Sequence, residues 1–61
     1  MSSETIFNFR PGDLVVKARG SHKGKIGIII SVITNSLGNT ILTVLTDRLV
    51  RNWYADYVEM L

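Results

Sequence analysis

Short segments rich in β-branched residues, separated by turn-forming residues, run along most of this sequence. Val, Ile and Thr supply 18 of the 61 residues, and branching at Cβ favours the extended backbone of a strand. No stretch keeps a helical apolar period over three turns. The sequence therefore predicts an all-β domain without a long helix.

The turn-forming residues place the expected strands. Pro11 and Gly12 are typical of a tight turn, and glycines bracket the polar loop 19–24. We expect strands at 14–18, 25–34, 40–46, 49–54 and 58–60, a hairpin loop at 35–39 and one helical turn at 55–57. Five short strands joined by tight turns are typical of a small antiparallel barrel, closed or half open. We predict that residues 11–61 form this barrel after an N-terminal arm of residues 1–10.

Size and composition exclude several classes of function. A core built from 61 residues is too small to enclose a large substrate cleft. The chain has no cysteine, so it holds no disulfide, thiolate metal site or cysteine nucleophile. His22 is the only histidine, and the carboxylates are scattered over separate turns without metal-ligand spacing. We predict no enzyme, no cofactor, no metal site and no small-molecule substrate.

No segment is typical of membrane insertion or secretion. The apolar run 28–30 is far shorter than a membrane-spanning helix. Residues 1–10 carry Glu4 and lack the apolar centre of a signal peptide. We expect neither a membrane partner nor secretion by a signal peptide.

The two middle strands are apolar on both faces. We expect the core to be formed by Leu14, Val16, Ile26, Ile28, Ile30, Val32, Val44, Trp53 and Val58. We expect Ile29, Ile33, Ile41 and Leu45 to point away from it, at least in part. Two explanations stay open: the sheet coils strongly around a barrel, or a partner covers its outer face. The second explanation predicts a protein interface formed by Phe7, Phe9, Ile29, Ile33, Ile41, Leu45 and Tyr54.

Positive charge is concentrated near the polar loop. Lys17, Arg19, Lys23 and Lys25 fall within nine positions, and no acidic residue interrupts them. Such cations bind phosphates with modest, salt-sensitive affinity. The alternative is a solvated loop that keeps a sheet edge soluble.

Two passages resemble known families. Residues 20–32, Gly-Ser-His-Lys-Gly-Lys-Ile-Gly-Ile-Ile-Ile-Ser-Val, resemble the KOW motif of ribosomal and transcription-elongation proteins, and residues 11–16 resemble the strand before it. Glycines at 24 and 27 suit a sharp turn and a close backbone approach. Residues 53–61 resemble the last helical turn and strand of Src-homology-3 barrels, although Tyr54 stands where those usually have proline. The resemblance implies a KOW-type, Src-homology-3-like barrel.

The resemblance implies a binding module but leaves its partner open. The whole sequence is also similar to small uncharacterised proteins of tailed bacteriophages. The high apolar fraction, the weak net charge and the two-faced middle strands favour an accessory structural subunit, cytoplasmic or virion-associated, that docks on a larger protein assembly such as a phage particle or forms a homo-oligomer. A KOW module that binds nucleic acid is the alternative, through Lys17, Arg19, Ser21, His22, Lys23 and Lys25. An adaptor for proline-rich peptides, using Tyr54 and Tyr57, is the third hypothesis.

Overall fold

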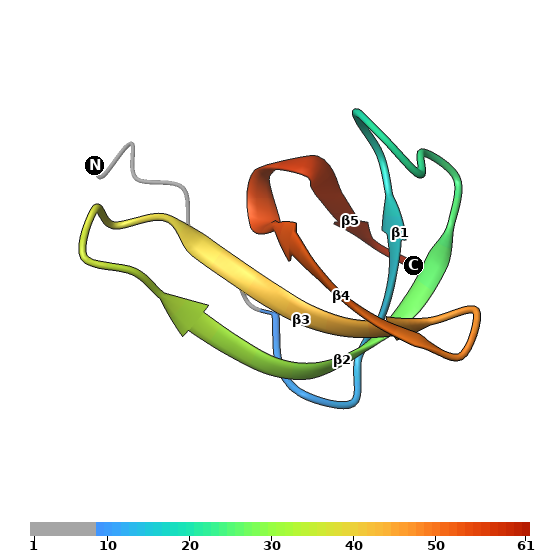
Figure 1. The fold of residues 1–61 in the computed structure, drawn as a ribbon, viewed down its shortest axis with the longest axis horizontal. Helices are drawn as coiled ribbons and strands as arrows, with labels where there is room; N and C mark the ends of the chain where they lie inside the picture. Colours follow the sequence, from blue (N-terminus) through green and yellow to red (C-terminus); the bar gives the residue numbers. More distant parts are fainter. Residues whose placement is uncertain (1–8) are drawn as a thin grey trace.

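Five strands form one antiparallel sheet in the computed structural model, which describes residues 9–61 (Figure 1). The elements are β1 (Leu14–Lys17), β2 (Ile26–Thr34), β3 (Thr40–Thr46), β4 (Leu49–Tyr54), the 3₁₀ turn η1 (Ala55–Tyr57) and β5 (Val58–Met60). Their order across the sheet is β4-β3-β2-β1-β5. The predicted all-β fold with a single helical turn is confirmed.

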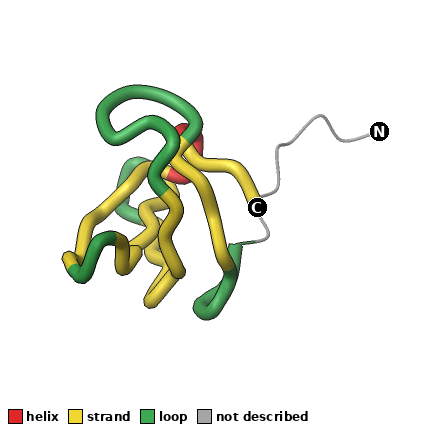
Figure 2. The backbone as a smooth tube through the Cα atoms, turned by 90° about the vertical axis from the view of Figure 1, so that its right-hand side faces the viewer, coloured by secondary structure: helices red, strands yellow, loops and turns green. Residues whose placement is uncertain are grey.

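The sheet curls along the long strand β2, which pairs with both β1 and β3. Its first residues pair with β1, while the strand pairs with β3 along most of its length. Strands β4 and β5 lie at the two edges of the sheet and, within residues 9–61, do not pair with each other. Figure 2 shows the strands curling around a common interior. The architecture is therefore a half-open barrel.

Turn chemistry fixes where the strands begin and end. Gly12 has a φ of 96°, and the Asp13 N–H donates to the Arg10 carbonyl at 3.1 Å, which closes the turn before β1. Asp47 and Arg48 have φ values of 51° and 64°. Two consecutive positive φ angles are typical of a two-residue hairpin, whose twist matches that of the flanking strands.

A β-bulge at Ile30 changes which residues of β2 face the interior. The pairing with β3 passes from Ile29 opposite Val44 to Ser31 opposite Thr43. Before the bulge, Gly27 and Ile29 are buried; beyond it, Val32 packs against the core. An extra residue on one strand reverses the alternation of faces in this way.

The core is small and draws on every strand. Its buried apolar residues are Val15, Ile29, Leu42, Val44, Trp53, Ala55 and Val58, with Phe9 and Val32 packed against them. The predicted burial of Val44, Trp53 and Val58 is confirmed. The prediction for the first half of the sheet is wrong: Leu14, Ile26, Ile28 and Ile30 are exposed, Val16 is only partly buried, and Ile29 is buried instead of facing outward.

Gly27 explains this inversion. A Cβ on Gly27 would lie 3.2 Å from the Leu45 carbonyl oxygen and 3.3 Å from the Val44 Cβ. Its side-chain position therefore faces the crowded interior, and side chains alternate along a strand. Ile29 accordingly points inward, whereas Ile28 points outward.

We call the opposite surface of strands β1 to β4 the outer face. Cross-strand pairing places its side chains in rows, because directly paired residues share a face. One apolar row contains Leu14, Ile28, Leu45 and Val50. A neutral polar row contains Ser31, Thr43 and Asn52, and a second apolar row contains Ile33, Ile41 and Tyr54. Val16 and Ile26 form a paired extension beside the first row.

Candidate interaction surfaces

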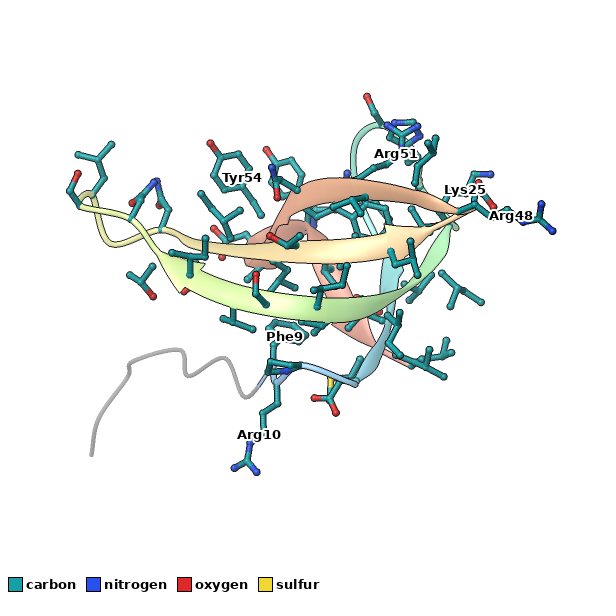
Figure 3. The ribbon with its side chains drawn as sticks, turned by 60° about the horizontal axis from the view of Figure 1, so that its bottom comes forward. Phe9, Arg10, Lys25, Arg48, Arg51 and Tyr54 are labelled. Carbon is teal, nitrogen blue, oxygen red and sulfur yellow. The ribbon has the colours of Figure 1, made fainter. Side chains whose placement is uncertain are left out.

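The loop before β2 and the turn between β3 and β4 meet at one end of the sheet. The Lys25 ammonium donates a hydrogen bond to the Asp47 carboxylate, and both side chains are exposed. Figure 3 shows Lys25 beside Arg48 at this end, with Arg51 on the same side and Arg10 pointing away at the far side of the molecule. We call the basic residues of the loop and the turn, with Arg51, the basic end: Arg19, His22, Lys23, Lys25, Arg48 and Arg51.

Backbone hydrogen bonds fix the loop that carries four of these six residues, Arg19, His22, Lys23 and Lys25. The Gly24 N–H donates to the Lys17 carbonyl at 2.8 Å, and the Lys25 N–H donates to the His22 carbonyl at 3.0 Å. Gly24 has a φ of 92° and His22 a φ of 64°, so the glycine takes the conformation that a side chain tolerates least. Ser21, His22 and Lys23 are all exposed on this loop.

Lys17 does not belong to the exposed cations. Its side chain is buried, at 6% exposure, and its ammonium donates to the Ser21 carbonyl at 2.8 Å. The same ammonium lies 5.3 Å from the centre of the Trp53 ring and 5.8 Å from that of Tyr57. Aromatic faces attract a cation at these distances. Lys17 thus holds the loop on the core, and we assign it no phosphate contact.

Asp47 sets the electrostatics of the turn. The hydrogen bond from Lys25 and the charge of that ammonium hold the pKa of the Asp47 carboxyl below its ordinary value of 3.8. The positive charge of Arg51, and that of His22 when protonated, act in the same direction. Asp47 is therefore ionised at neutral pH and engages Lys25. Within residues 9–61, Arg19, Lys23, Arg48 and Arg51 form no ion pair.

Tyr54 and Tyr57 are exposed next to the base of the loop. Their ring centroids lie 6.3 Å apart with an interplanar angle of 61°, an edge-to-face contact. The Tyr57 carbonyl accepts the Ala18 N–H at 2.7 Å. The described part of the chain encloses no pocket beside them, so nothing in this geometry favours the peptide-adaptor hypothesis over a surface contact.

Residues 11–45 match the family model described as KOW motif, which covers more than half of the chain. The chain belongs to the KOW family. KOW motifs are non-catalytic binding modules, so membership indicates an interaction module, for nucleic acid or for protein. No curated protein and no solved structure matches the chain. The comparisons do not support the similarity to bacteriophage proteins.

The matched KOW segment runs from the turn before β1 to the end of the apolar hairpin. It contains the loop cations Arg19, Lys23 and Lys25, but it ends before Arg48 and Arg51. Folding brings these two arginines close to the loop before β2, although they lie outside the matched segment. Sequence reasoning missed them because they lie more than twenty positions after the loop; the two-residue turn at Asp47 was the signal that would have placed them.

The residues predicted for a protein interface divide between three places. Ile33, Ile41, Leu45 and Tyr54 lie on the outer face. Ile29 belongs to the core, Phe9 packs against the core, and Phe7 lies outside the described residues. Of the predicted interface residues, those on the outer face therefore remain available for contact with a partner. Among residues 9–61, no helix has the length and apolar character needed to cross a membrane.

Proposed function

We propose that this KOW protein binds the phosphate backbone of nucleic acid with its basic end. The observation that supports this proposal is the convergence of loop and turn: Lys25 pairs with Asp47, and Arg48 and Arg51 lie beside them. Arg19 and Lys23 add two more exposed cations on the loop. Cations from separate segments that share one end of a small domain form an electrostatic footprint for phosphate.

The number of free cations limits the affinity. Each phosphate that is neutralised lowers the slope of log K against log salt by about 0.7 on single strands and 0.9 on duplex DNA. Four cations that form no ion pair within residues 9–61, Arg19, Lys23, Arg48 and Arg51, therefore give modest binding that weakens steeply as salt rises. Backbone contacts carry no sequence information, so we expect little preference among sequences.

The first test removes three of these cations. The variant with Arg19→Gln, Lys23→Gln and Arg48→Gln should bind labelled RNA and DNA oligonucleotides at least about tenfold more weakly at low salt, with a salt slope smaller by about 2–3. Fluorescence anisotropy over a range of salt concentrations measures both quantities. Arg10→Gln is the matched control, since Arg10 is exposed but points away from the basic end. The proposal fails if the wild-type protein binds no oligonucleotide at low salt, or if Arg10→Gln weakens binding as much.

The second test strengthens the site instead. Asp47→Asn removes the carboxylate that engages Lys25, and asparagine tolerates the positive φ of 51° at this position. The released ammonium should raise affinity for oligonucleotides and increase the salt slope by about one. Anisotropy titrations beside the wild-type protein measure the change, and weaker binding by Asp47→Asn would contradict a phosphate site here.

A docking role in a larger protein assembly is the second candidate function. The exposed apolar rows of the outer face favour it. Covering exposed apolar side chains such as Leu45, Val50 and Ile33 with a partner removes them from water and lowers the free energy. The test is the mass of the native complex in cell extract, compared between the wild-type protein and Leu45→Lys. A complex of unchanged mass would argue against docking through this face.

A further inference from the structure

The outer face of strands β1 to β4 carries apolar and neutral polar side chains, and Glu59 of β5 brings a charge to its margin opposite Val16. Leu14, Ile28, Leu45 and Val50 lie side by side across four strands, and they are 52%, 38%, 42% and 62% exposed. The sequence contains no Asp, Glu, Lys or Arg from residue 26 to residue 46, so β2 and β3 bring no charge to this face. The row beside it offers only neutral hydroxyl and amide groups, with Thr43 donating to Asn52 at 3.0 Å.

The absence of charge from the apolar rows of this face indicates which kind of partner surface can bind there. A partner surface that carries charge would lose its hydration against these side chains without gaining an opposite charge. A second copy of the outer face brings the same apolar rows, with the charge of Glu59 at the margin beyond Val16. A two-fold contact is self-complementary in this sense, because the same patch serves on both subunits.

A two-fold contact of this kind needs only a small part of the chain's surface. A specific interface buries at least about 1,000 Å² in total, or about 500 Å² from each partner. The surface of the chain is 4557 Å², so a contact of that size covers about one ninth of it. Four of the five strands present side chains on the outer face, and two sheets pack face to face at about 10 Å.

We propose that two copies of this chain pair through their outer faces, as a two-fold dimer of stacked sheets. The inference rests on the docking candidate above and names its partner as a second copy. Leu45 and Val50 lie next to each other in the first apolar row and form part of the contact.

Sedimentation of the full chain over a wide concentration range tests the dimer. We expect the dimer mass at high concentration and dissociation on dilution. Leu45→Lys should raise the dissociation constant at least about tenfold, because it places a charge in an apolar contact. Val50→Lys is a second variant with the same expected effect, since Val50 is 62% exposed and tolerates a polar side chain in the monomer.

Leu49→Lys is the matched control. Leu49 is 53% exposed and pairs with the buried Thr46, so its side chain lies on the opposite side of the sheet from the outer face. A wild-type monomer at every concentration overturns the proposal, as does a dimer that responds to Leu49→Lys as strongly as to Leu45→Lys. If the wild-type protein is a monomer but Leu45→Lys still disrupts the native complex, self-pairing falls and the docking role stands. If Leu45→Lys changes neither measurement, both fall.

Discussion

Ile29→Ala is expected to lower the free energy of unfolding by about 2–5 kcal/mol, whereas Ile28→Ala should lower it by about 1 kcal/mol or less. The two residues are neighbours of identical chemistry. Ile29 is 2% exposed in the core, and Ile28 is 38% exposed on the outer face. Truncation of Ile29 leaves a cavity that the curled sheet cannot fill, while truncation of Ile28 leaves space that water occupies.

Urea denaturation followed by circular dichroism at low protein concentration measures this difference. A domain of this size has a total stability of only about 3–5 kcal/mol, so Ile29→Ala is expected to leave much of the chain unfolded. Ile29→Val, with an expected cost of about 0.5–1.5 kcal/mol, provides a folded comparison with Ile28→Val. Equal losses at the two positions would contradict the placement of these faces.

Gly27→Val is expected to destabilise the fold by about 3 kcal/mol, the upper part of the range for overpacked cores. The new Cβ would lie 3.2 Å from the Leu45 carbonyl oxygen and 3.4 Å from the Thr46 Cβ. The nearest atom belongs to the backbone of a paired strand, so it cannot rotate away. The two further methyl groups of valine increase the crowding, and β2 and β3 must separate to accommodate them.

Thermal unfolding of Gly27→Val beside Ile26→Val measures this cost. Ile26 is 51% exposed on the neighbouring position, so its conversion to valine should change stability by about 0.5 kcal/mol or less. A Gly27→Val variant as stable as this control would show that β2 and β3 are not held at the distance described.

The strands could be predicted because the turns between them are marked by turn-forming residue types in the local sequence. Pro11 with Gly12 and the pair Asp47-Arg48 mark turns by residue type, and strand ends follow within about one residue. The faces of the strands could not be predicted in the same way. Residues 26–33 are apolar on both faces, so alternation alone admits two answers, and the bulge at Ile30 breaks the alternation. The decisive residue was Gly27, whose missing side chain gives no apolar signal.

The basic end could be predicted only in part for a related reason. The loop cations stand together in the sequence, and Arg19, Lys23 and Lys25 are exposed as a local reading expects. Lys17 was included among the predicted phosphate-binding residues on the basis of its charge. Its charge alone does not reveal that its ammonium contacts two aromatic rings and the Ser21 carbonyl. The burial of Lys17 depends on tertiary contacts, and so does the position of Arg48 at the basic end.

The position of Trp53 provides a built-in optical reporter of folding. It is the only tryptophan of the chain, it is 4% exposed, and the Lys17 side chain lies against its ring. Solutes that quench indole emission on collision should therefore have little effect on the native protein and a strong effect on the unfolded chain. The indole lies in the core, whereas Arg48 and Leu45 belong to the basic end and the outer face, so a ligand that contacts these residues should change its emission much less than unfolding does. Fluorescence of the unlabelled protein can thus separate loss of folding from loss of binding in each variant.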